Sequence, residues 1–594
     1  MVRPRAATAA GGVLMTDTDA TNAQGIPDPE GHHHPIDTEY DVGQNNIEGS
    51  VGRFGFDIHN PVFAISGLTV AAFVIFTLAL PDQAGALFSA LFDFVTGTFD
   101  WFFLSVGNLV VLFCLALIVL PVGSVRLGGA DATPDYGYVG WFAMLFAAGM
   151  GIGLMFYGVA EPTGHFEAAL GGVTTGEDGL RTDWAPLGGA AGNEAEAVRL
   201  GMAATIYHWG LHPWAIYAVV ALALALYSYN KGLPLTIRSA FYPILGERIW
   251  GWPGHVIDIL AVFATLFGLA TSLGFGATQA ANGLTVLYGS GVAEEGTRAF
   301  LGMPFGNTEE SGTANSDWLL VLLISVITLV ALISVLRGLE GGVKRLSELN
   351  MGLAIILLLF VLLAGPTMQV IGAFFSSLWA YLEYLPALSN PFGREDTNFV
   401  QGWTSFYWAW WISWSPFVGM FIARVSRGRT VREFIVCVLL IPSLVCVLWM
   451  SVFGGTAIQQ FLETGFNGVL DAPLELKLFE MLGQLPLASL TSLVGIVLVI
   501  VFFVTSSDSG SLVIDTITAG GKIDAPVPQR VFWCTFEGAV AMVLLLSAGG
   551  LASLQSMVIS TGLPFAVVLV ALCVCISMGL RTERTAIRTA MAAE

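Results

Sequence analysis

Apolar stretches long enough to cross a lipid bilayer recur along the whole chain. A hydrocarbon core about 30 Å thick requires roughly 20 predominantly apolar residues in each helix. Twelve stretches meet this requirement, near residues 62–80, 101–121, 138–158, 203–229, 256–288, 318–336, 350–372, 401–423, 433–454, 487–507, 530–549 and 553–579. The pattern therefore predicts an all-α integral membrane protein with twelve transmembrane helices.

The composition agrees with this class and argues against others. Hydrophobic residues make up 55% of the chain and charged residues 11%, whereas soluble domains carry roughly a quarter charged residues. The net charge is −20, with 44 acidic and 24 basic residues, which argues against a nucleic acid as partner. The six cysteines all lie in apolar stretches and show neither a disulfide framework nor a zinc-binding spacing.

Basic residues alternate between the predicted loops. Cytoplasmic loops of membrane proteins are enriched in Lys and Arg, and most of the 24 basic residues lie in the two terminal segments and the even-numbered loops. The alternation predicts a multi-pass protein of the cytoplasmic (inner) membrane with both termini inside. Residues 1–57 are acidic and lack an apolar signal-peptide region. We expect a disordered cytoplasmic tail at 1–57, the twelve-helix domain at 58–580 and a short cytoplasmic tail at 581–594.

The segments between the spans differ in character. Residues 159–200 and 290–317 are rich in glycine, alanine and acidic residues, and we expect them to form long external loops. Residues 372–399 contain Trp379, Tyr381 and Tyr384, which favours an amphipathic helix at the outer interface.

Two predicted spans contain residues that disfavour a continuous helix. The third carries Gly149, Gly151 and Gly153, and each glycine costs about 0.5–1 kcal/mol in a helix relative to alanine. Close packing against a neighbouring helix is one explanation. The other is an unwound stretch near the bilayer midplane, whose carbonyls bind a cation and whose N–H groups bind a substrate carboxylate. The eighth span carries Pro416 and Gly419, which suggests two inverted five-helix repeats, spans 3–7 and 8–12, after two leading helices.

Two clusters of aromatic residues lie inside predicted spans. Trp209, Trp214 and Tyr217 of the fourth span fall within one arc of a helix, and Trp411 and Trp414 of the eighth share a face. A quaternary ammonium group has no N–H to donate, but ring faces attract its charge by up to about 2 kcal/mol per desolvated contact. If the two faces meet, they form an aromatic box for such a cation. A plain aromatic core is the alternative.

Other residues of these spans have simpler interpretations. We expect Trp403 at the membrane interface and Trp410 against a neighbouring helix or the cytoplasmic pathway. His208 and His212 are interpreted as hydrogen-bonded core residues rather than ligands.

At these residues the chain resembles the betaine/choline/carnitine transporter family, and within it the sodium-coupled glycine betaine carriers. The resemblance covers roughly residues 54–580. It rests on four motifs: GMGIG at 149–153, HWGLH at 208–212, WAWWISWSPF at 408–417 and RVSRGRTVRE at 424–433.

The resemblance implies a LeuT-type fold, assembled as a homotrimer, with a substrate cage formed by the two aromatic clusters. It also implies a sodium site between spans three and ten. The ligands at the matching positions are the backbone carbonyls of Ala147, Met150 and Phe502 and the hydroxyls of Thr505 and Ser506. The polar run 505–509 at the end of an apolar helix agrees, although a helix end facing water has the same composition.

A second sodium site of some family members is less well matched. Its pattern has two threonines one helical turn apart in span five and a nearby aromatic residue. Thr265 and Phe417 match this pattern, but Leu269 stands where the other threonine is expected and has no ligand atom.

The expected activity is sodium-coupled symport, by alternating access, of glycine betaine or a similar compatible solute. Gly153 supplies no counter-ion for a lone positive charge, which favours a zwitterion over choline. Sodium-independent exchange is one alternative, and symport of ectoine, dimethylsulfoniopropionate, carnitine or choline is another. A channel would need a continuous polar pore. An enzyme is not expected, because no catalytic carboxylate pair, activated nucleophile or metal-ligand spacing occurs.

Overall fold

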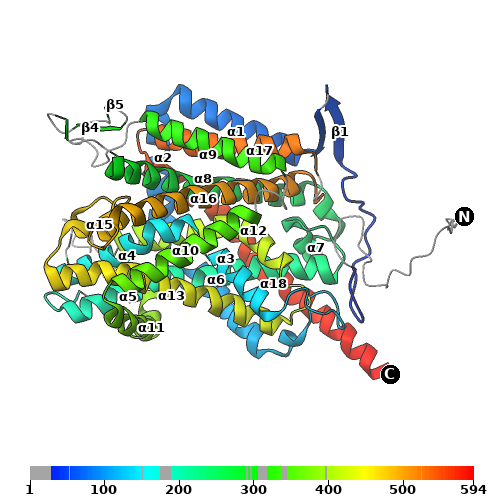
Figure 1. The fold of residues 1–594 in the computed structure, drawn as a ribbon. Helices are drawn as coiled ribbons and strands as arrows, with labels where there is room; N and C mark the ends of the chain where they lie inside the picture. The colour runs from blue at the N-terminus through cyan, green and yellow to red at the C-terminus, as the bar shows by residue number, and fades with distance from the viewer. Residues whose placement is uncertain are drawn as a thin grey trace, which may run out of the picture.

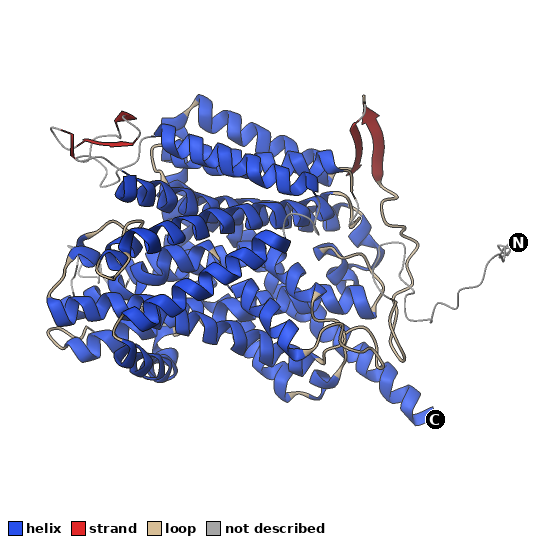
Figure 2. Ribbon diagram, in the orientation of Figure 1, coloured by secondary structure: helices blue, strands red, loops and turns tan. Residues whose placement is uncertain are grey.

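Long helices lie side by side through most of the molecule (Figures 1 and 2). The computed structural model describes residues 28–52, 54–149, 151–173, 175, 189–288, 292–293, 297–300, 303–304, 317–337, 344–394, 396, 398–522 and 525–593. In this part of the chain, ten helices are long and apolar enough to cross a membrane, and a bent pair of helices makes an eleventh candidate. The all-α membrane fold is therefore confirmed at this level.

The longer helices follow the apolar stretches closely. They are α1 (Val62–Ala79), α2 (Pro81–Val119), α3 (Tyr138–Gly149), α4 (Ile152–Gly171), α5 (Glu194–Trp209), α6 (Leu211–Ala225), α8 (Trp252–Tyr288), α9 (Asp317–Arg337), α10 (Lys344–Ala364), α11 (Thr367–Leu388), α12 (Ser405–Arg424), α13 (Val431–Thr464), α16 (Ala488–Thr518), α17 (Val527–Leu546) and α18 (Leu551–Ala593).

Shorter elements connect these helices. They comprise α7 (Tyr242–Leu245), α14 (Gly468–Asp471), α15 (Lys477–Gly483), π-helical turns at Leu226–Asn230 and Asn398–Thr404, and 3₁₀ turns at Pro121–Ser124, Ile237–Phe241 and Gly246–Trp250. Two small antiparallel sheets lie outside the bundle: β1 (Asn46–Val51) with β2 (Phe54–His59), and β3 (Val292–Ala293), β4 (Thr297–Phe300) and β5 (Met303–Pro304).

Helix α12 corresponds to the predicted eighth span but is not among the ten. Its tryptophans, serines and proline lower its mean hydropathy, although all but a few of its residues are buried in the bundle. The twelve-span count and the inverted repeat stay predictions.

The break expected in the third span is present. Helices α3 and α4 meet at an angle of 66°, and Gly151 between them has an extended backbone, with φ −163° and ψ −178°. The helical ladder is therefore interrupted in the middle of the molecule.

The corresponding break expected in the eighth span is wrong, because α12 is helical from Ser405 to Arg424. Proline cannot donate to the carbonyl four residues earlier, and for Pro416 that carbonyl belongs to Ile412. The Ser415 hydroxyl donates to the Ile412 carbonyl at 2.6 Å instead. Gly419 serves packing, since a Cβ there would lie 2.7 Å from a methyl group of Val220.

The predicted external loop at 159–200 is also partly wrong. Helix α4 continues to Gly171 and α5 begins at Glu194, and His165, Phe166 and Ala169 are buried. These residues pack inside the bundle because α4 is longer than the apolar run that marks its first half.

The segment expected to be a disordered tail packs on the bundle over its described residues, 28–52 and 54–57. Strand β1 pairs with β2, Glu30 forms an ion pair with Arg427 at 2.6 Å, and Asp57 pairs with Lys522 at 2.5 Å. Backbone pairing and ion pairs therefore hold the segment. Helix α18 likewise continues through residues 581–593, which we expected to form a tail.

His59 at the end of β2 connects this hairpin to the bundle. Burial, and then the Arg238 guanidinium, lower the pKa of His59 to about 3. The imidazole is therefore neutral at pH 7, with Nδ1 3.0 Å from Asn46 Oδ1 and Nε2 3.1 Å from Nη1 of Arg238. Nδ1–H then donates to Asn46, and Nε2 accepts from Arg238.

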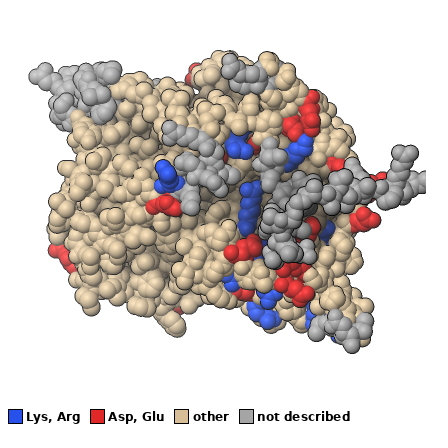
Figure 3. Space-filling model, turned by 45° about the vertical axis from the view of Figure 1, so that its right-hand side comes forward, with Lys and Arg blue, Asp and Glu red and all other residues tan. Residues whose placement is uncertain are grey.

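The two ends of the bundle differ. The β1–β2 hairpin and the C-terminal end of α18 lie at one end, and β4, β5 and α15 lie at the other (Figure 1). In Figure 3, most of the visible Lys, Arg, Asp and Glu residues gather on the right-hand half of the surface, whereas most of the left-hand half carries few charged residues. This distribution is typical of a protein with a lipid-facing belt and a charged aqueous face.

Candidate binding site

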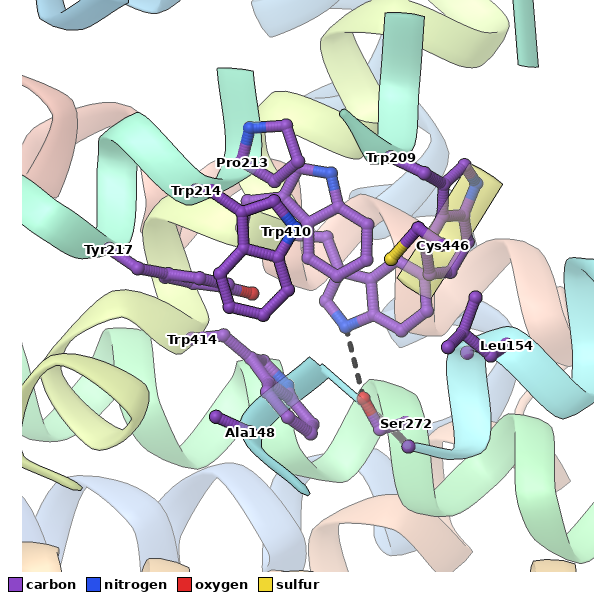
Figure 4. A pocket seen from close by; sticks show the side chains of 13 residues that line it. Ala148, Leu154, Trp209, Pro213, Trp214, Tyr217, Ser272, Trp410, Trp414 and Cys446 are labelled. Atoms are coloured by element: carbon purple, nitrogen blue, oxygen red, sulfur yellow. Dashed lines mark hydrogen bonds between the residues drawn. The ribbon is translucent and has the colours of Figure 1, made fainter. Parts of the chain in front are cut away.

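The two aromatic clusters meet at one cavity beside the α3–α4 break. The empty space that it offers, part of which is open to solvent, is about 480 Å³. The lining comes from α3, α4, α5, α6, α8, α12 and α13 and comprises Ala148, Gly151, Gly153, Leu154, Trp209, Pro213, Trp214, Tyr217, Ser272, Trp410, Trp411, Trp414 and Cys446 (Figure 4). We call this cavity the aromatic cage. All five rings predicted to form it line it.

The cage rings face one another at close range. Trp411 lies edge-to-face with Trp209 at 5.0 Å between centroids and with Tyr217 at 6.3 Å. Trp214 and Tyr217 are 5.3 Å apart, also edge-to-face. Figure 4 shows Trp214, Tyr217 and Trp414 on one side of the cavity and Trp209, Leu154 and Cys446 on the other. No described residue of the lining carries a charge, so the rings provide the electrostatics of the site.

Hydrogen bonds fix the orientation of these rings. Trp414 Nε1 donates to the Gly268 carbonyl at 2.8 Å, and Trp411 Nε1 donates to the His208 carbonyl at 2.9 Å. Because the indole N–H groups of Trp411 and Trp414 are both satisfied by the protein, the faces of these two rings stay free to contact a ligand. These two rings are therefore oriented without one.

The glycines of the broken span have different places. Gly151 and Gly153 line the cage, and Gly149 ends α3 next to them. A Cβ on Gly153 would lie 2.9 Å from Trp209 Cη2 and 3.0 Å from Trp410 Cη2. Gly153 therefore lets two rings approach the start of α4. There the Leu154 N–H donates to the Gly151 carbonyl at 3.2 Å, and helix geometry gives the N–H groups of Ile152 and Gly153 no acceptor within the helix.

Trp410 contacts the neighbouring helix α8, as one of our two expectations had it, and it also lines the cage, which we did not expect. Its ring stacks on Trp411 at 4.8 Å and 11°, and its Nε1 donates to Ser272 Oγ at 3.0 Å (Figure 4). Spacing was the missed signal, because Trp410 and Trp414 stand four residues apart and share a helix face.

A second cavity adjoins the cage. Ala148 and Trp414 line both cavities. The remaining lining of the second cavity comprises Ala147, Ser347, Asn350, Met351, Phe417, Val418, Phe421, Phe502, Thr505, Ser506 and Ser509. We call it the hydroxyl cavity, because hydroxyl groups supply most of its polar atoms.

The hydroxyl cavity brings together most residues of the predicted sodium site. Ala147, Phe502, Thr505 and Ser506 all line it, although they come from α3 and α16, far apart in the sequence. Met150 lies outside the described residues. The Thr505 hydroxyl now donates to the carbonyls of Val501 and Phe502, at 3.0 and 3.2 Å, which leaves its oxygen lone pairs available to a cation.

The predicted second sodium site is not assembled in the same way. Phe417 lines the hydroxyl cavity, but Thr265 lines neither cavity. The Thr265 hydroxyl is buried and donates to the Ala261 carbonyl at 2.7 Å.

Comparisons with known proteins identify the family of this chain. The family model of betaine/carnitine/choline transporters matches residues 61–585. The chain belongs to this family. It is 60% identical over 562 residues to a glycine betaine/proline/choline transporter of Vibrio parahaemolyticus, covering 95% of this chain and 97% of the relative. A glycine betaine/proline/choline/ectoine transporter of the same species is 50% identical over 560 residues, or 93% and 92% of the two chains. A glycine betaine transporter of Bacillus subtilis is 40% identical over 532 residues, or 89% and 96%.

Family membership makes this betaine/carnitine/choline family protein a membrane transporter and not an enzyme. His208 and His212 are buried and hydrogen-bonded: His208 Nδ1 lies 2.6 Å from Glu161 Oε1, and His212 Nε2 lies 3.1 Å from Asn108 Oδ1. Their interpretation as core residues rather than ligands stays a prediction, because the ligand atoms of Glu161, His165 and His208 lie close enough together to hold a metal ion. Trp403 does not line the cage. It packs against His165 at 4.6 Å and Tyr157 at 6.3 Å.

Sequence reasoning missed Glu161. This carboxylate is fully buried in α4 and contacts His208 and the cage residue Trp209. We did not consider Glu161 as a membrane-embedded charge, because residue 161 lies just inside the predicted external loop at 159–200. An ionisable residue inside a membrane span is expected to be functional.

Proposed function

We propose that this transporter couples the uptake of glycine betaine to an inward sodium gradient by alternating access. The observation that carries the proposal is the pair of adjoining cavities. One is built from aromatic rings and the other is lined by hydroxyl groups, and Ala148 and Trp414 separate them.

The cage suits the ammonium end of the substrate. A trimethylammonium group cannot donate hydrogen bonds, and its diffuse charge is attracted to ring faces. The uncharged lining favours a ligand that is neutral overall. Burying a lone cation without a counter-ion is costly, so a zwitterion fits better than choline.

The first turn of α4 suits the carboxylate end. Gly151 is the N-cap of α4 and lines the cage together with Gly153. N–H groups at a helix N-terminus attract anions. The distance between the rings and this turn therefore sets the length of the zwitterion, and compact substrates are favoured. Proline, ectoine, carnitine, dimethylsulfoniopropionate and choline are the alternatives.

The hydroxyl cavity suits sodium. Thr505 and Ser506 offer neutral hard oxygens from α16, and the C-terminal end of α3 at Ala147 offers carbonyl oxygens that the helix does not use. A cation held there contacts both α3 and α16. Its binding is therefore linked to the position of the broken span, and hence to the cage.

The orientation follows from the basic residues. The end that carries the β1–β2 hairpin also carries Lys231, Arg427 and Lys522, which pair with Glu583, Glu30 and Asp57. We propose that this end is cytoplasmic, in the inner membrane. The homotrimer implied by the family resemblance stays a prediction.

Uptake into proteoliposomes tests the proposal. Labelled glycine betaine is supplied outside with either a sodium gradient or an equal potassium gradient, and we expect accumulation only with sodium. Equal uptake in both cases removes the symport claim. Sodium-independent uptake that is stimulated by glycine betaine inside the vesicles would instead establish an exchanger.

A matched pair of variants assigns the effect to the hydroxyl cavity. Thr505→Val removes a hydroxyl that lines it, and Thr516→Val removes one on the same helix that only donates to Leu512 within α16. We expect Thr505→Val to raise the sodium concentration for half-maximal uptake by roughly tenfold, equivalent to about 1.4 kcal/mol. Thr516→Val is expected to match the wild type. Equal sodium dependence of both variants would refute this site.

A further inference from the structure

Glu161 is the centre of a hydrogen-bond cluster beside the cage. Its Oε1 lies 2.6 Å from His208 Nδ1 and 3.2 Å from His165 Nε2. Its Oε2 accepts from Trp209 Nε1 and from the Tyr407 hydroxyl, both at 2.6 Å. An ionised carboxylate has about four lone-pair sites, so these four partners account for all of them.

The protons in the cluster can be assigned from these contacts. A carboxylate only accepts, so Nδ1 of His208 carries the proton that it shares with Glu161. In a neutral imidazole the other nitrogen accepts, and His208 Nε2 lies 3.0 Å from the Thr404 hydroxyl. The cluster thus extends from α4 through α5 to the residue just before α12.

The partners of Glu161 come from helices that form different walls of the cage. Glu161 lies on α4, Trp209 on α5 and Tyr407 on α12. Trp209 is itself a cage ring, and Tyr407 stacks on the cage ring Trp411 at 5.8 Å and 29°. The carboxylate therefore holds two cage walls against α4, one directly and one through Tyr407.

The cluster lies on the side of the cage away from the hydroxyl cavity. Glu161 follows the cage residue Gly153 by eight residues, about 12 Å along α4 at 1.5 Å per residue. The hydroxyl cavity adjoins the cage at Ala148, on the other side of the break. Rings fill the Glu161 side: Tyr157 lies 5.4 Å from Tyr407 and 6.4 Å from Trp209.

We propose that Glu161 is a positioning residue that holds this end of the cage closed, and that α5 and α12 leave Glu161 when the cage opens there. This inference rests on the proposed alternating-access function. Opening removes donors from a buried carboxylate, which is costly until water replaces them. The cluster therefore stabilises the state in which the cage is closed on the Glu161 side.

Cys446 reports this opening, because it lines the cage and is buried. The full-length protein is reconstituted in vesicles of known orientation, and a charged, membrane-impermeant methanethiosulfonate reagent is added from each face separately. Peptide mass spectrometry then gives the labelling rate at Cys446. The other five cysteines do not interfere with a readout that is specific to one peptide.

Two variants loosen the cluster and one serves as control. Glu161→Gln keeps the side-chain size but places an NH₂ group against existing donors, and Tyr407→Phe removes one donor and keeps the ring. Thr163→Val alters a buried hydroxyl of the same helix that bonds only to α4 carbonyls. Glu161 belongs to residues 159–200, which we expect on the external side. Labelling from the external face should therefore become roughly tenfold faster in the first two variants, equivalent to about 1.4 kcal/mol in the free energy of opening.

The remaining outcomes overturn the inference. Labelling rates equal to the wild type in both Tyr407→Phe and Glu161→Gln would show that the cluster does not hold the cage closed, as would acceleration from the cytoplasmic face alone. If Glu161→Gln does not reach the membrane, Tyr407→Phe decides. Labelling needs neither sodium nor glycine betaine, so its failure is distinguishable from a failure of the proposed transport.

Discussion

Replacement of Trp411 by leucine tests whether the rings bind the cargo through its charge. Trp411 contacts Trp209, Tyr217 and Trp410, so it lies at the centre of the cage wall. Leucine keeps apolar bulk and removes the ring face. Loss of one desolvated cation–π contact costs about 2 kcal/mol, which raises the dissociation constant of glycine betaine roughly 30-fold.

The neighbouring rings add to this effect. Without Trp411, its edge-to-face contacts with Trp209 and Tyr217 are lost, and such contacts are worth about 0.5–1.5 kcal/mol each. A further loss of about 1.4 kcal/mol would add another factor of ten. The expected range is therefore about 30- to 300-fold, measured with labelled glycine betaine on purified protein.

Trp403→Leu is the matched control, because Trp403 packs outside the cage lining. We expect its affinity to stay within about threefold of the wild type, a difference of less than 1 kcal/mol. A second arm uses 3,3-dimethylbutanoate, which has the shape of glycine betaine but carbon in place of the ammonium nitrogen. The wild type should prefer glycine betaine, and Trp411→Leu should reduce that preference. Wild-type affinity in Trp411→Leu, or equal affinity of the wild type for both ligands, would refute the reasoning.

Three further variants test the structure around the site. Gly153→Ala places a Cβ about 3 Å from two cage rings, so overpacking of about 1–3 kcal/mol should weaken glycine betaine binding while the amount of folded protein stays unchanged. Ser415→Ala removes the donor to the Ile412 carbonyl. The loss of this hydrogen bond should reduce the stability by about 1 kcal/mol and lower the thermal unfolding midpoint. An unchanged midpoint would mean that the carbonyl left without a donor by Pro416 needs no replacement. Glu583→Gln leaves Lys231 buried without the carboxylate that now lies 2.6 Å from it, which should cost about 3–5 kcal/mol of stability. Thermal unfolding measures this loss of stability, and uptake at moderate temperature shows whether transport is impaired as well.

The sequence predicts the helices of this protein well, because length and hydropathy alone define a membrane span. It fails where a helix is stabilised by something other than apolar residues. Glu161 and His165 looked like loop residues, yet they are buried because each satisfies the other at 3.2 Å. The predicted break at Pro416 failed because one hydroxyl, on Ser415, replaces the missing donor. Pairings of this kind depend on side-chain geometry, which hydropathy does not encode.

The cage was predictable because spacing places aromatic residues on one helix face. The identity of all its rings was not, since Trp410 and Trp411 are adjacent in sequence and lie about 100° apart on an ideal helix. Both rings line the cavity because they stack on each other, with an interplanar angle of 11°, and so form one wall together. Gly153 allows this by leaving room for Trp410 beside Trp209. The spacing of Trp410 and Trp414 within one span therefore indicates that Trp410 can face the cavity, and the absence of a side chain at Gly153 on another helix decides that its ring fits there.

The two cavities share part of their walls. Ala148 and Trp414 belong to both linings, and Trp414 is held by the Gly268 carbonyl of α8. Under the proposed function, a cation in the hydroxyl cavity would act on the end of α3, which begins the break, and a zwitterion in the cage would act on the start of α4, which ends it. Each ligand therefore changes the free energy of the same short piece of backbone. Linkage requires such an effect to be reciprocal: the factor by which sodium raises the affinity for the zwitterion equals the factor by which the zwitterion raises the affinity for sodium. Coupling of the proposed kind then needs no path between distant sites, because Ala148 at the end of α3 belongs to both linings and Gly151, three residues further on, lines the cage.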